Sequence, residues 1–256
     1  MARSTFYYNI RRLGQLDGYD NLRKDINHIY RKHYGRYGYR RITIELNEDD
    51  GIVVNHKTVQ KLMCQMGLKA KRKKAAKYRS YKGNIGKVAP NIINRDFHSD
   101  KPNQKWTIDV TEVKIHDRKT YLSPILDMYY GKIITYGISD HPDLKMVTTM
   151  LSQAFNKEKY LDGLFFHPDQ GWHYQHKRYQ KIITDRHIIQ SMSRKGNCMD
   201  NSMTELLYFQ EWDNVEQFNV ELRKYIHYYN YNRIKLRLNG KSPVKYRTLP
   251  RLEEAS

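Results

Sequence analysis

The sequence predicts an α/β protein in which a mixed-sheet core follows a small all-α segment and precedes a C-terminal helix. Apolar residues recur at helical spacing over the first 68 residues, β-branched residues alternate from Trp106, and basic residues concentrate before that point. We expect a helical segment over 1–68, a basic linker over 69–104, the sheet core over 105–212 and a C-terminal helix with a basic tail over 213–256.

Three short helices are expected in the first segment. Residues 20–33 form one behind Asp20 as a cap, residues 39–47 form the next, and Asn55 caps a third that ends at Gly67. The last two helices, joined by a tight turn, have the shape of a helix-turn-helix. An ordinary helical hairpin with a solvated polar face is the alternative.

The core begins as an antiparallel meander and continues with alternating helices and strands, which predicts a mixed sheet. The expected elements are strands at 106–115, 120–128 and 132–138, a helix at 143–155, a strand at 161–167, a helix at 175–186, a strand at 188–189, and helices near Asn201 and over 214–230.

Charge is unevenly distributed along the chain, which has 46 Lys or Arg, 27 Asp or Glu and a net charge of +19. Residues 1–105 carry +15, whereas residues 106–205 carry only +1. A basic N-terminal part suits a polyanion, which it would bind in a sequence-independent, salt-sensitive way. A merely soluble basic surface is the alternative. The residues expected to contact DNA are Arg40, Arg41, His56, Lys57, Thr58, Lys61, Lys71, Arg72, Lys73, Lys74, Arg194 and Lys195.

Composition excludes several other classes. With 39% apolar and 12% aromatic residues, the chain is not a disordered polycation. It has no apolar run of roughly 20 residues and no signal-peptide core, so we expect no membrane partner. Two cysteines are too few for a disulfide scaffold or a cysteine zinc site. These features predict a soluble protein of a reducing compartment.

Three carboxylates in the charge-balanced region carry the candidate chemistry. Asp109 is expected inside the first strand, Asp169 follows a short buried strand, and Glu205 falls in the helix after Asn201. Three hard oxygen donors without cysteine suit Mg²⁺ or Mn²⁺. Two such ions can stabilise the attacking and leaving oxygens of a phosphodiester. The neighbouring acids Glu112, Asp127 and Asp200 are expected to be structural, with Asp127 ending a strand.

Several blocks of the sequence resemble bacterial insertion-sequence transposases. They are residues 106–112 (Trp-Thr-Ile-Asp-Val-Thr-Glu), 167–174 (His-Pro-Asp-Gln-Gly-Trp-His-Tyr) and 191–201. Residues 36–43 and 55–63 resemble the helix-turn-helix of that group, and 230–233 with 242–247 resemble its C-terminal signature. The chain is most similar to the catalytic subunit encoded by the second of two overlapping reading frames.

The resemblance implies a ribonuclease-H-like, retroviral-integrase-like core with an Asp-Asp-Glu triad at Asp109, Asp169 and Glu205. It implies Mg²⁺-dependent cleavage by water at the element's ends, attack of the freed 3′-hydroxyl on another phosphodiester in target DNA, and no covalent enzyme–DNA intermediate. Implied partners are the terminal repeats, target DNA, a first-reading-frame subunit or a fusion with it, and further copies of the chain on DNA. The implied location is bacterial, cytoplasmic and nucleoid-associated.

Two departures from the family pattern bear on activity. Pro168 stands where relatives have Ser, and proline has a fixed φ and no N–H donor. Trp212 stands seven residues beyond Glu205, where relatives carry a DNA-contacting Lys on the same helix face, and the segment up to 214 is shortened. The alternative function is therefore a DNA-binding remnant with impaired catalysis. A metal-dependent nuclease without strand transfer is a third interpretation.

Overall fold

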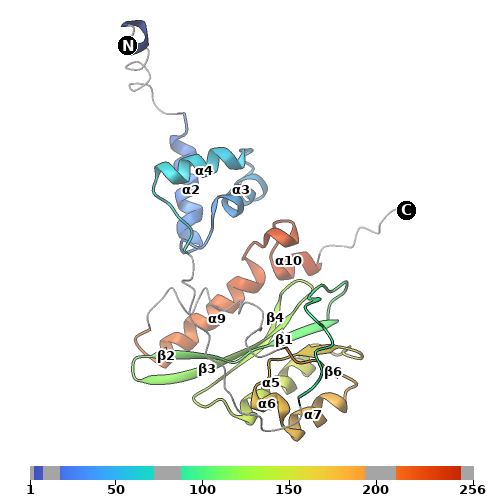
Figure 1. Ribbon diagram of the computed structural model, residues 1–256. Helices are drawn as coiled ribbons and strands as arrows, with labels where there is room; N and C mark the ends of the chain where they lie inside the picture. The colour runs from blue at the N-terminus through green and yellow to red at the C-terminus, as the bar shows by residue number, and fades with distance from the viewer. Residues whose placement is uncertain (1–2, 8–17, 72–87, 194–211, 249–256) are drawn as a thin grey trace, which may run out of the picture. The chain divides into compact units, whose positions relative to one another are not determined.

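The computed structural model describes residues 3–7, 18–71, 88–193 and 212–248, and the chain divides into two compact units, 1–72 and 73–256 (Figure 1). Within the described ranges, no helix is both long and apolar enough to cross a membrane. The predicted helix near Asn201, together with Asp200, Glu205, Arg194 and Lys195, lies outside the described residues.

The first unit is a three-helix cluster of α2 (Asp20–Lys32), α3 (Tyr39–Glu48) and α4 (His56–Gln65). Their inward apolar faces form one core made of Ile26, Ile29, Ile42, Leu46, Val59, Leu62 and Met63. Asn55 caps α4 as predicted, because its side chain accepts a hydrogen bond from the Lys57 N–H. The predicted cap at Asp20 is wrong: Asp20 lies in the first turn of α2, after Tyr19.

A buried carboxylate joins α2 to α3. Glu45 is 2% exposed, and its two oxygens contact Lys32 Nζ and His33 Nε2, each at 2.7 Å. Burial opposes ionisation of Glu45, but its hydrogen bonds to His33 and Lys32 leave its pKa below the ordinary value. The His33 ring in turn stacks on Tyr37 at a centroid distance of 3.7 Å.

The second unit contains the predicted mixed sheet. Its strands are β1 (Lys105–Ile108), β2 (Thr111–Ile115), β3 (Arg118–Asp127), β4 (Ile133–Ser139), β5 (Phe165–His167) and β6 (Ile189–Gln190). Strand β3 pairs antiparallel with β4 along one edge and with β1 and β2 along the other. Strand β1 pairs in parallel with β5, and β5 with β6. The antiparallel meander and the later parallel strands are both confirmed.

Two of the predicted elements differ in extent. The expected continuous strand at 106–115 is interrupted at Asp109 and Val110, so Asp109 follows a strand instead of lying inside one. The expected helix at 175–186 is two helices, α6 (Trp172–Gln175) and α7 (Lys177–Thr184), because His176 is extended and caps α7 through the Arg178 N–H.

Helices cover both faces of the sheet (Figure 1). Helix α5 (Leu144–Lys157) packs with α6 and α7 against one face, around Trp106, Ile125 and Phe166. Helix α9 (Val215–Tyr231) packs against the other face through Phe218, Leu222, Tyr225 and Tyr229. Tyr225 and Tyr229 are thus core residues, whereas Tyr231 is 47% exposed.

Residues 88–99, which the sequence assigns to the basic linker, pack along β1, β5 and the chain after β6. Lys105 Nζ donates to the carbonyl oxygens of Asp96 and His98 at 2.8 and 2.6 Å. Phe97 contacts the His167 ring edge-on at a centroid distance of 6.1 Å. This segment therefore supports the strands that lead to Asp109 and Asp169.

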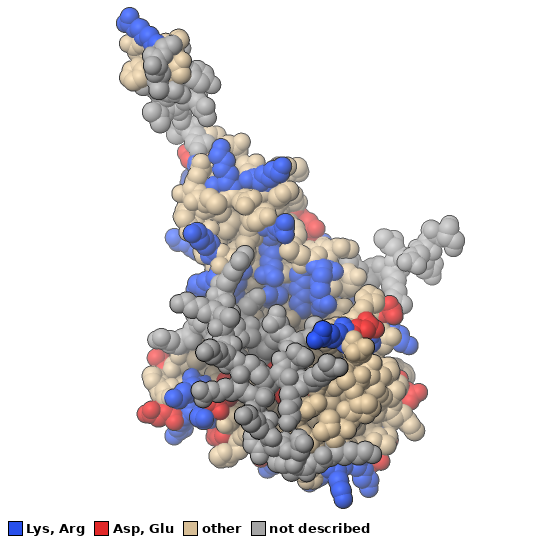
Figure 2. All heavy atoms as spheres, in the orientation of Figure 1, with Lys and Arg blue, Asp and Glu red and all other residues tan. Residues whose placement is uncertain are grey.

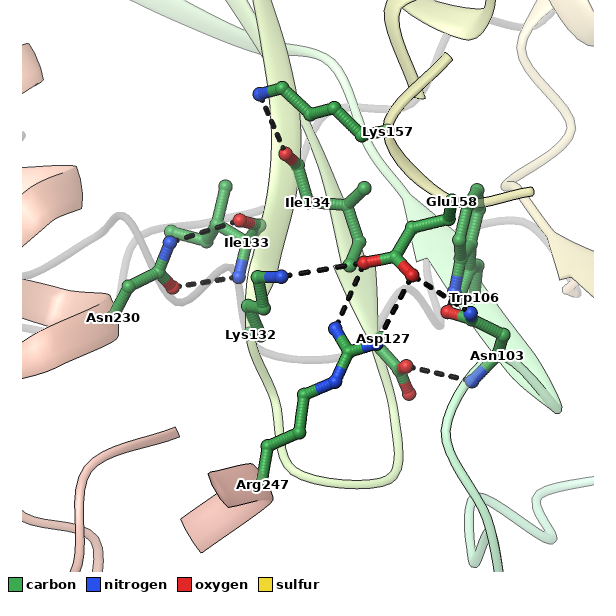
Figure 3. Close-up of polar contacts among 10 residues, drawn as sticks. All are labelled: Asn103, Trp106, Asp127, Lys132, Ile133, Ile134, Lys157, Glu158, Asn230 and Arg247. Carbon is green, nitrogen blue, oxygen red and sulfur yellow. Dashed lines mark hydrogen bonds and ion pairs between the residues drawn. The ribbon is translucent and has the colours of Figure 1, made fainter. Parts of the chain in front are cut away.

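The C-terminal part is fastened to the sheet by side chains of its sequence signature. Asn230 of α9 accepts from the Ile133 N–H and donates to the Ile133 carbonyl, at 2.9 and 3.0 Å. After the 3-10 helix η1 (Leu236–Leu238), helix α10 (Pro243–Thr248) brings Arg247 to Glu158 in a two-pronged contact at 3.0 and 3.2 Å (Figure 3). Both contacts tie the chain's last helices to the core.

Glu158 and Asp127 lie together at this junction (Figure 3). The side chain of Glu158 is 9% exposed, and Arg247, Asn103 and Lys132 together hold its pKa down at about 2 against the opposing effect of burial. Asp127 ends β3, as predicted, and accepts the N–H groups of Asn103 and Tyr129. Burial raises the pKa of Asp127. Asp127 is thus a structural acid.

Replacing Arg247 with Met should destabilise the second unit by about 2 kcal/mol, because Glu158 then stays buried with weaker compensation. Lys245→Met on the same helix is the control, since Lys245 is exposed and forms no ion pair with another described residue. Urea unfolding followed by circular dichroism measures both. Equal midpoints for the two variants would show that the Arg247–Glu158 pair is not stabilising.

Candidate functional site

The two predicted catalytic aspartates, Asp109 and Asp169, follow the ends of two adjacent parallel strands, β1 and β5. In the parallel pairing of β1 with β5, Thr107 lies opposite His167. Asp109 comes two residues after Thr107, and Asp169 comes two residues after His167. Because adjacent strands are about 4.8 Å apart, both aspartates follow from neighbouring points at one end of the sheet. Thr107 Oγ1 also donates to the His167 carbonyl at 3.1 Å, which ties the two strand ends together.

The Asp169 carboxylate is oriented by its own loop. The Gly171 N–H donates to Asp169 Oδ1 at 2.8 Å. A Cβ at position 171 would lie 2.9 Å from that oxygen and 3.3 Å from the Tyr174 ring, so only glycine permits this close approach. One carboxylate oxygen is therefore held by the backbone, and Oδ2 remains for a ligand.

Burial makes the Asp169 charge costly. It raises the pKa of Asp169, and the Gly171 N–H and nearby His173 offset this effect only in part. His173 is itself buried, with Nε2 hydrogen-bonded to the Pro142 carbonyl. A carboxylate that is disfavoured as a bare anion in this position gains from a bound cation.

His167, immediately before the Asp169 loop, is part of a buried network. Ser191 Oγ accepts the N–H groups of Ile92 and Ile93, at 3.0 and 3.2 Å, and lies 3.0 Å from His167 Nδ1. The serine hydroxyl proton is thus left to donate to Nδ1, which we assign as the unprotonated ring nitrogen. Burial lowers the pKa of His167, in keeping with a neutral, structural imidazole rather than a DNA contact.

The chain toward Glu205 departs from beside Asp169. The N–H groups of Ile189, Ser191 and Ser193 donate to the carbonyls of Leu164, Phe166 and Pro168, at 2.8, 3.0 and 3.0 Å. This ladder extends the parallel pairing of β5 to the residue before Asp169. Pro168 accepts within the ladder through its carbonyl, although it has no N–H to donate. Glu205 itself lies outside the described residues.

The donor set suits a hard divalent cation. Among the described residues, no group of three or more His, Cys, Asp or Glu is arranged to hold a metal ion. Asp109 and Asp169 follow the ends of the adjacent parallel strands β1 and β5, and carboxylate oxygens are what Mg²⁺ and Mn²⁺ prefer. Glu112, the other acid near this point in sequence, is exposed and pairs with Lys119.

The helical unit presents basic residues around α3 and α4. His56 stacks on Tyr39 at a centroid distance of 6.1 Å, and the Arg40 guanidinium lies 5.5 Å from the same ring. These contacts bring the N-terminal ends of the two helices together. On the face in Figure 2, Lys and Arg outnumber Asp and Glu over this unit. Among the predicted DNA contacts, Arg40, His56, Lys57, Lys61 and Lys71 are exposed, Arg41 and Thr58 are partly buried, and Arg72, Lys73, Lys74, Arg194 and Lys195 are not described.

The sheet order, with two aspartates at adjacent parallel strand ends, places the second unit in the class of ribonuclease-H-like polynucleotidyl transferases of the Asp-Asp-Glu type. Residues 99–198 match the integrase core domain family, as do residues 203–249 with a second model of that name. Residues 19–76 match the HTH-like domain family.

Relatives along nearly the whole chain identify the family. The chain is 44% identical to the protein assigned as transposase InsK of insertion sequence element IS150 from Escherichia coli, over 96% of this chain and 90% of that protein. It is 37% identical to the transposase for insertion sequence element IS904 of Lactococcus lactis, over 88% of this chain and 92% of that protein. The chain therefore belongs to the insertion-sequence transposases that carry an integrase core.

A solved structure shows the same fold. The simian T-cell lymphotropic virus intasome, in complex with the PP2A regulatory subunit B56 gamma, aligns with a TM-score of 0.50 and 14% identity. The alignment covers 84% of this chain and 72% of that chain. The predicted ribonuclease-H-like core, helix-turn-helix segment and C-terminal helix are confirmed.

Asp169→Asn should stabilise the ion-free protein, because the amide keeps an oxygen for the Gly171 N–H without the buried charge. A raised pKa in the folded state means that the stability contributed by protonated Asp169 is lost as pH rises above about 4. The advantage of the variant should thus grow between pH 4 and 7.

Mg²⁺ should make the wild-type protein more stable than Asp169→Asn, the reverse of the order expected without ions. At 100 times its Kd, Mg²⁺ should stabilise the wild-type protein by about 2.7 kcal/mol and the variant far less. Thermal unfolding with and without Mg²⁺ measures both effects, and Asp162→Asn, at an exposed turn, is the control. Equal stabilisation of all three proteins by Mg²⁺ would exclude Asp169 as a ligand.

Proposed function

We propose that this chain is the catalytic subunit of its transposase, cutting DNA strands at the ends of the element and joining the freed 3′-hydroxyl to target DNA. Asp109, Asp169 and Glu205 would hold two Mg²⁺ ions, with Mn²⁺ as a substitute. The observation that carries the proposal is the β1–β5 register, which sets Asp109 and Asp169 at neighbouring strand ends. The ladder that brings Ser193 to Pro168 supports Glu205 as the third ligand, because it starts the connecting segment beside Asp169.

The reaction comprises two displacements at phosphorus. Water attacks the scissile phosphodiester, the bond from phosphorus to the 3′-oxygen breaks, and a 3′-hydroxyl is left on the element end. That hydroxyl then attacks a target phosphodiester, forms a new phosphorus–oxygen bond and displaces the 3′-oxygen of the target strand. When bound, the divalent ions would activate the nucleophile and neutralise developing charge.

Hydrogen bonds within the protein preorganise the Asp169 loop and the ends of β1 and β5. The Gly171 N–H fixes one oxygen of Asp169, and Thr107 holds the two strand ends together. The His167–Ser191 contact joins the Asp169 loop to residues 92 and 93. These hydrogen bonds hold the carboxylates in place before DNA arrives, which lowers the reorganisation needed in the reaction.

The helical unit would grip DNA through phosphate contacts. Exposed Lys57 and Lys61 lie on α4, beside His56 at its first turn. Recognition of the element's ends would also involve the first-reading-frame subunit or a fusion with it, and several copies of the chain would assemble on DNA.

One observation favours the rival function, a DNA-binding remnant. Trp212, at the position where the family resemblance implies a DNA-contacting Lys, is 7% exposed and packs edge-on against Phe218 at 5.3 Å. A core residue at this position presents no cation to DNA. The rival therefore predicts binding without chemistry.

A strand-transfer assay separates these functions. Pre-cut DNA carrying the inverted repeats that flank the gene is mixed with a target plasmid, Mg²⁺ and the full chain. We expect joined product that falls at least a hundredfold in Asp169→Asn and persists in Asp162→Asn. Binding without product would favour the remnant, and hydrolysis without joining would indicate a nuclease.

Removing two cations of α4 should weaken DNA binding and its salt dependence. For Lys57→Ala with Lys61→Ala, the slope of log Kd against log salt should fall by about 1.8, since each lost phosphate contact removes about 0.9. Fluorescence anisotropy at several salt concentrations measures the slope. Lys24→Ala, exposed on α2, serves as the control. An unchanged slope in the double variant would place the DNA contact elsewhere.

A further inference from the structure

Two buried hydroxyls lie beside the aspartate pair without a hydrogen-bond partner. Among the described residues, neither Tyr174 nor Ser123 has a partner for its hydroxyl, and each residue is fully buried. A buried hydroxyl without a partner costs free energy, so retaining one calls for a reason. Phenylalanine would fill the space of Tyr174 without that cost.

The position of Tyr174 supplies the reason. The Tyr174 ring and the Asp169 carboxylate both lie next to Gly171. A Cβ at position 171 would be 3.3 Å from Tyr174 Cδ2 and Cε2 and 2.9 Å from Asp169 Oδ1. Burial first, and then the charges of Asp169 and Asp109, raise the pKa of the Tyr174 phenol well above its usual range, and the Ser123 hydroxyl opposes this effect. Both carboxylates are thus near one hydroxyl that keeps its proton and forms no hydrogen bond of ordinary geometry with the described residues.

Ser123 sits on the same side of the sheet. In the pairing of β1 with β3, Ile108 lies opposite Ile125, so Ser123 is two residues along β3, next to the break that contains Asp109. Ile108, Ile125 and Tyr174 share one core cluster. The tyrosine therefore reaches from α6 toward the strand end that carries the first aspartate.

We propose that Tyr174 is a positioning residue for the metal-binding carboxylates: its hydroxyl donates a hydrogen bond to Asp169 when the ions are bound and keeps the free oxygen turned toward them. The inference rests on the proposed function, since it presumes that Asp169 binds metal. No proton is transferred; the hydroxyl acts only as a donor. Groups that hold a metal ligand in place commonly alter metal affinity tenfold or more.

Tyr179 offers a matched control. It is also fully buried with an unpartnered hydroxyl, and its ring lies 5.4 Å from that of Tyr174. Burial alone raises the pKa of Tyr179, without a contribution from either aspartate. Changing either tyrosine to Phe removes the same atom from the same core, but only one of the two atoms is beside the site.

The test is calorimetric titration of the full chain with Mn²⁺, together with thermal unfolding of the ion-free protein. Tyr174→Phe should weaken Mn²⁺ binding about tenfold. Tyr179→Phe should stay within twofold of wild type. Both variants should unfold at or above the wild-type temperature, because each loses a buried hydroxyl without a partner.

Wild-type affinity in Tyr174→Phe, while Asp169→Asn abolishes binding, would overturn this inference and leave the metal site intact. Undiminished binding in Asp169→Asn would overturn the proposed metal site and this inference with it. Equal losses of affinity in the two tyrosine variants, or a lower unfolding temperature for Tyr174→Phe alone, would show a structural role and overturn the inference.

Discussion

The parallel pairing of β1 with β5 is the constraint on which the rest of the site depends. It sets Thr107 against His167, and every neighbour of the aspartate pair follows from that register. A slip of one residue would turn the buried side chains of one of the two strands to the opposite face of the sheet and shift its aspartate relative to the other. The register is secured from both sides, by the Thr107 hydroxyl on the β1 side and by the N–H groups of residues 189–193 on the β6 side.

The two units differ in which charged groups they expose and which they bury. The helical unit exposes most of its cations and buries Glu45 between α2 and α3, where Lys32 and His33 compensate its charge. The second unit does the reverse at its site, where Asp169 is partly buried without a cation in direct contact among the described residues. That difference suits the proposed division into a surface that binds a polyanion and a site that would bind a metal ion.

Sequence patterns predicted the mixed sheet, the cap at Asn55, and the strand-ending role of Asp127, because each depends on local spacing. They missed the break at Asp109, because an alternating run does not reveal where pairing with β3 is interrupted before it resumes in β2. Gly171, Ser191 and Tyr174 were missed as site residues for a related reason: their roles arise from contacts between β5, α6 and the chain after β6. The one sequence feature that pointed to these three residues is that they lie within the blocks that resemble transposases. The resemblance to transposases supplied the choice of acids, which spacing alone did not.

The side chain of Asn230 has a consequence for the outer edge of the sheet. Among the described residues, strand β4 pairs with one strand only, β3, so its other side can offer backbone groups to a further strand. The Asn230 amide occupies both the N–H and the C=O of Ile133, much as a partner strand would. Polymerisation through this edge is thereby discouraged at the strand's first residue.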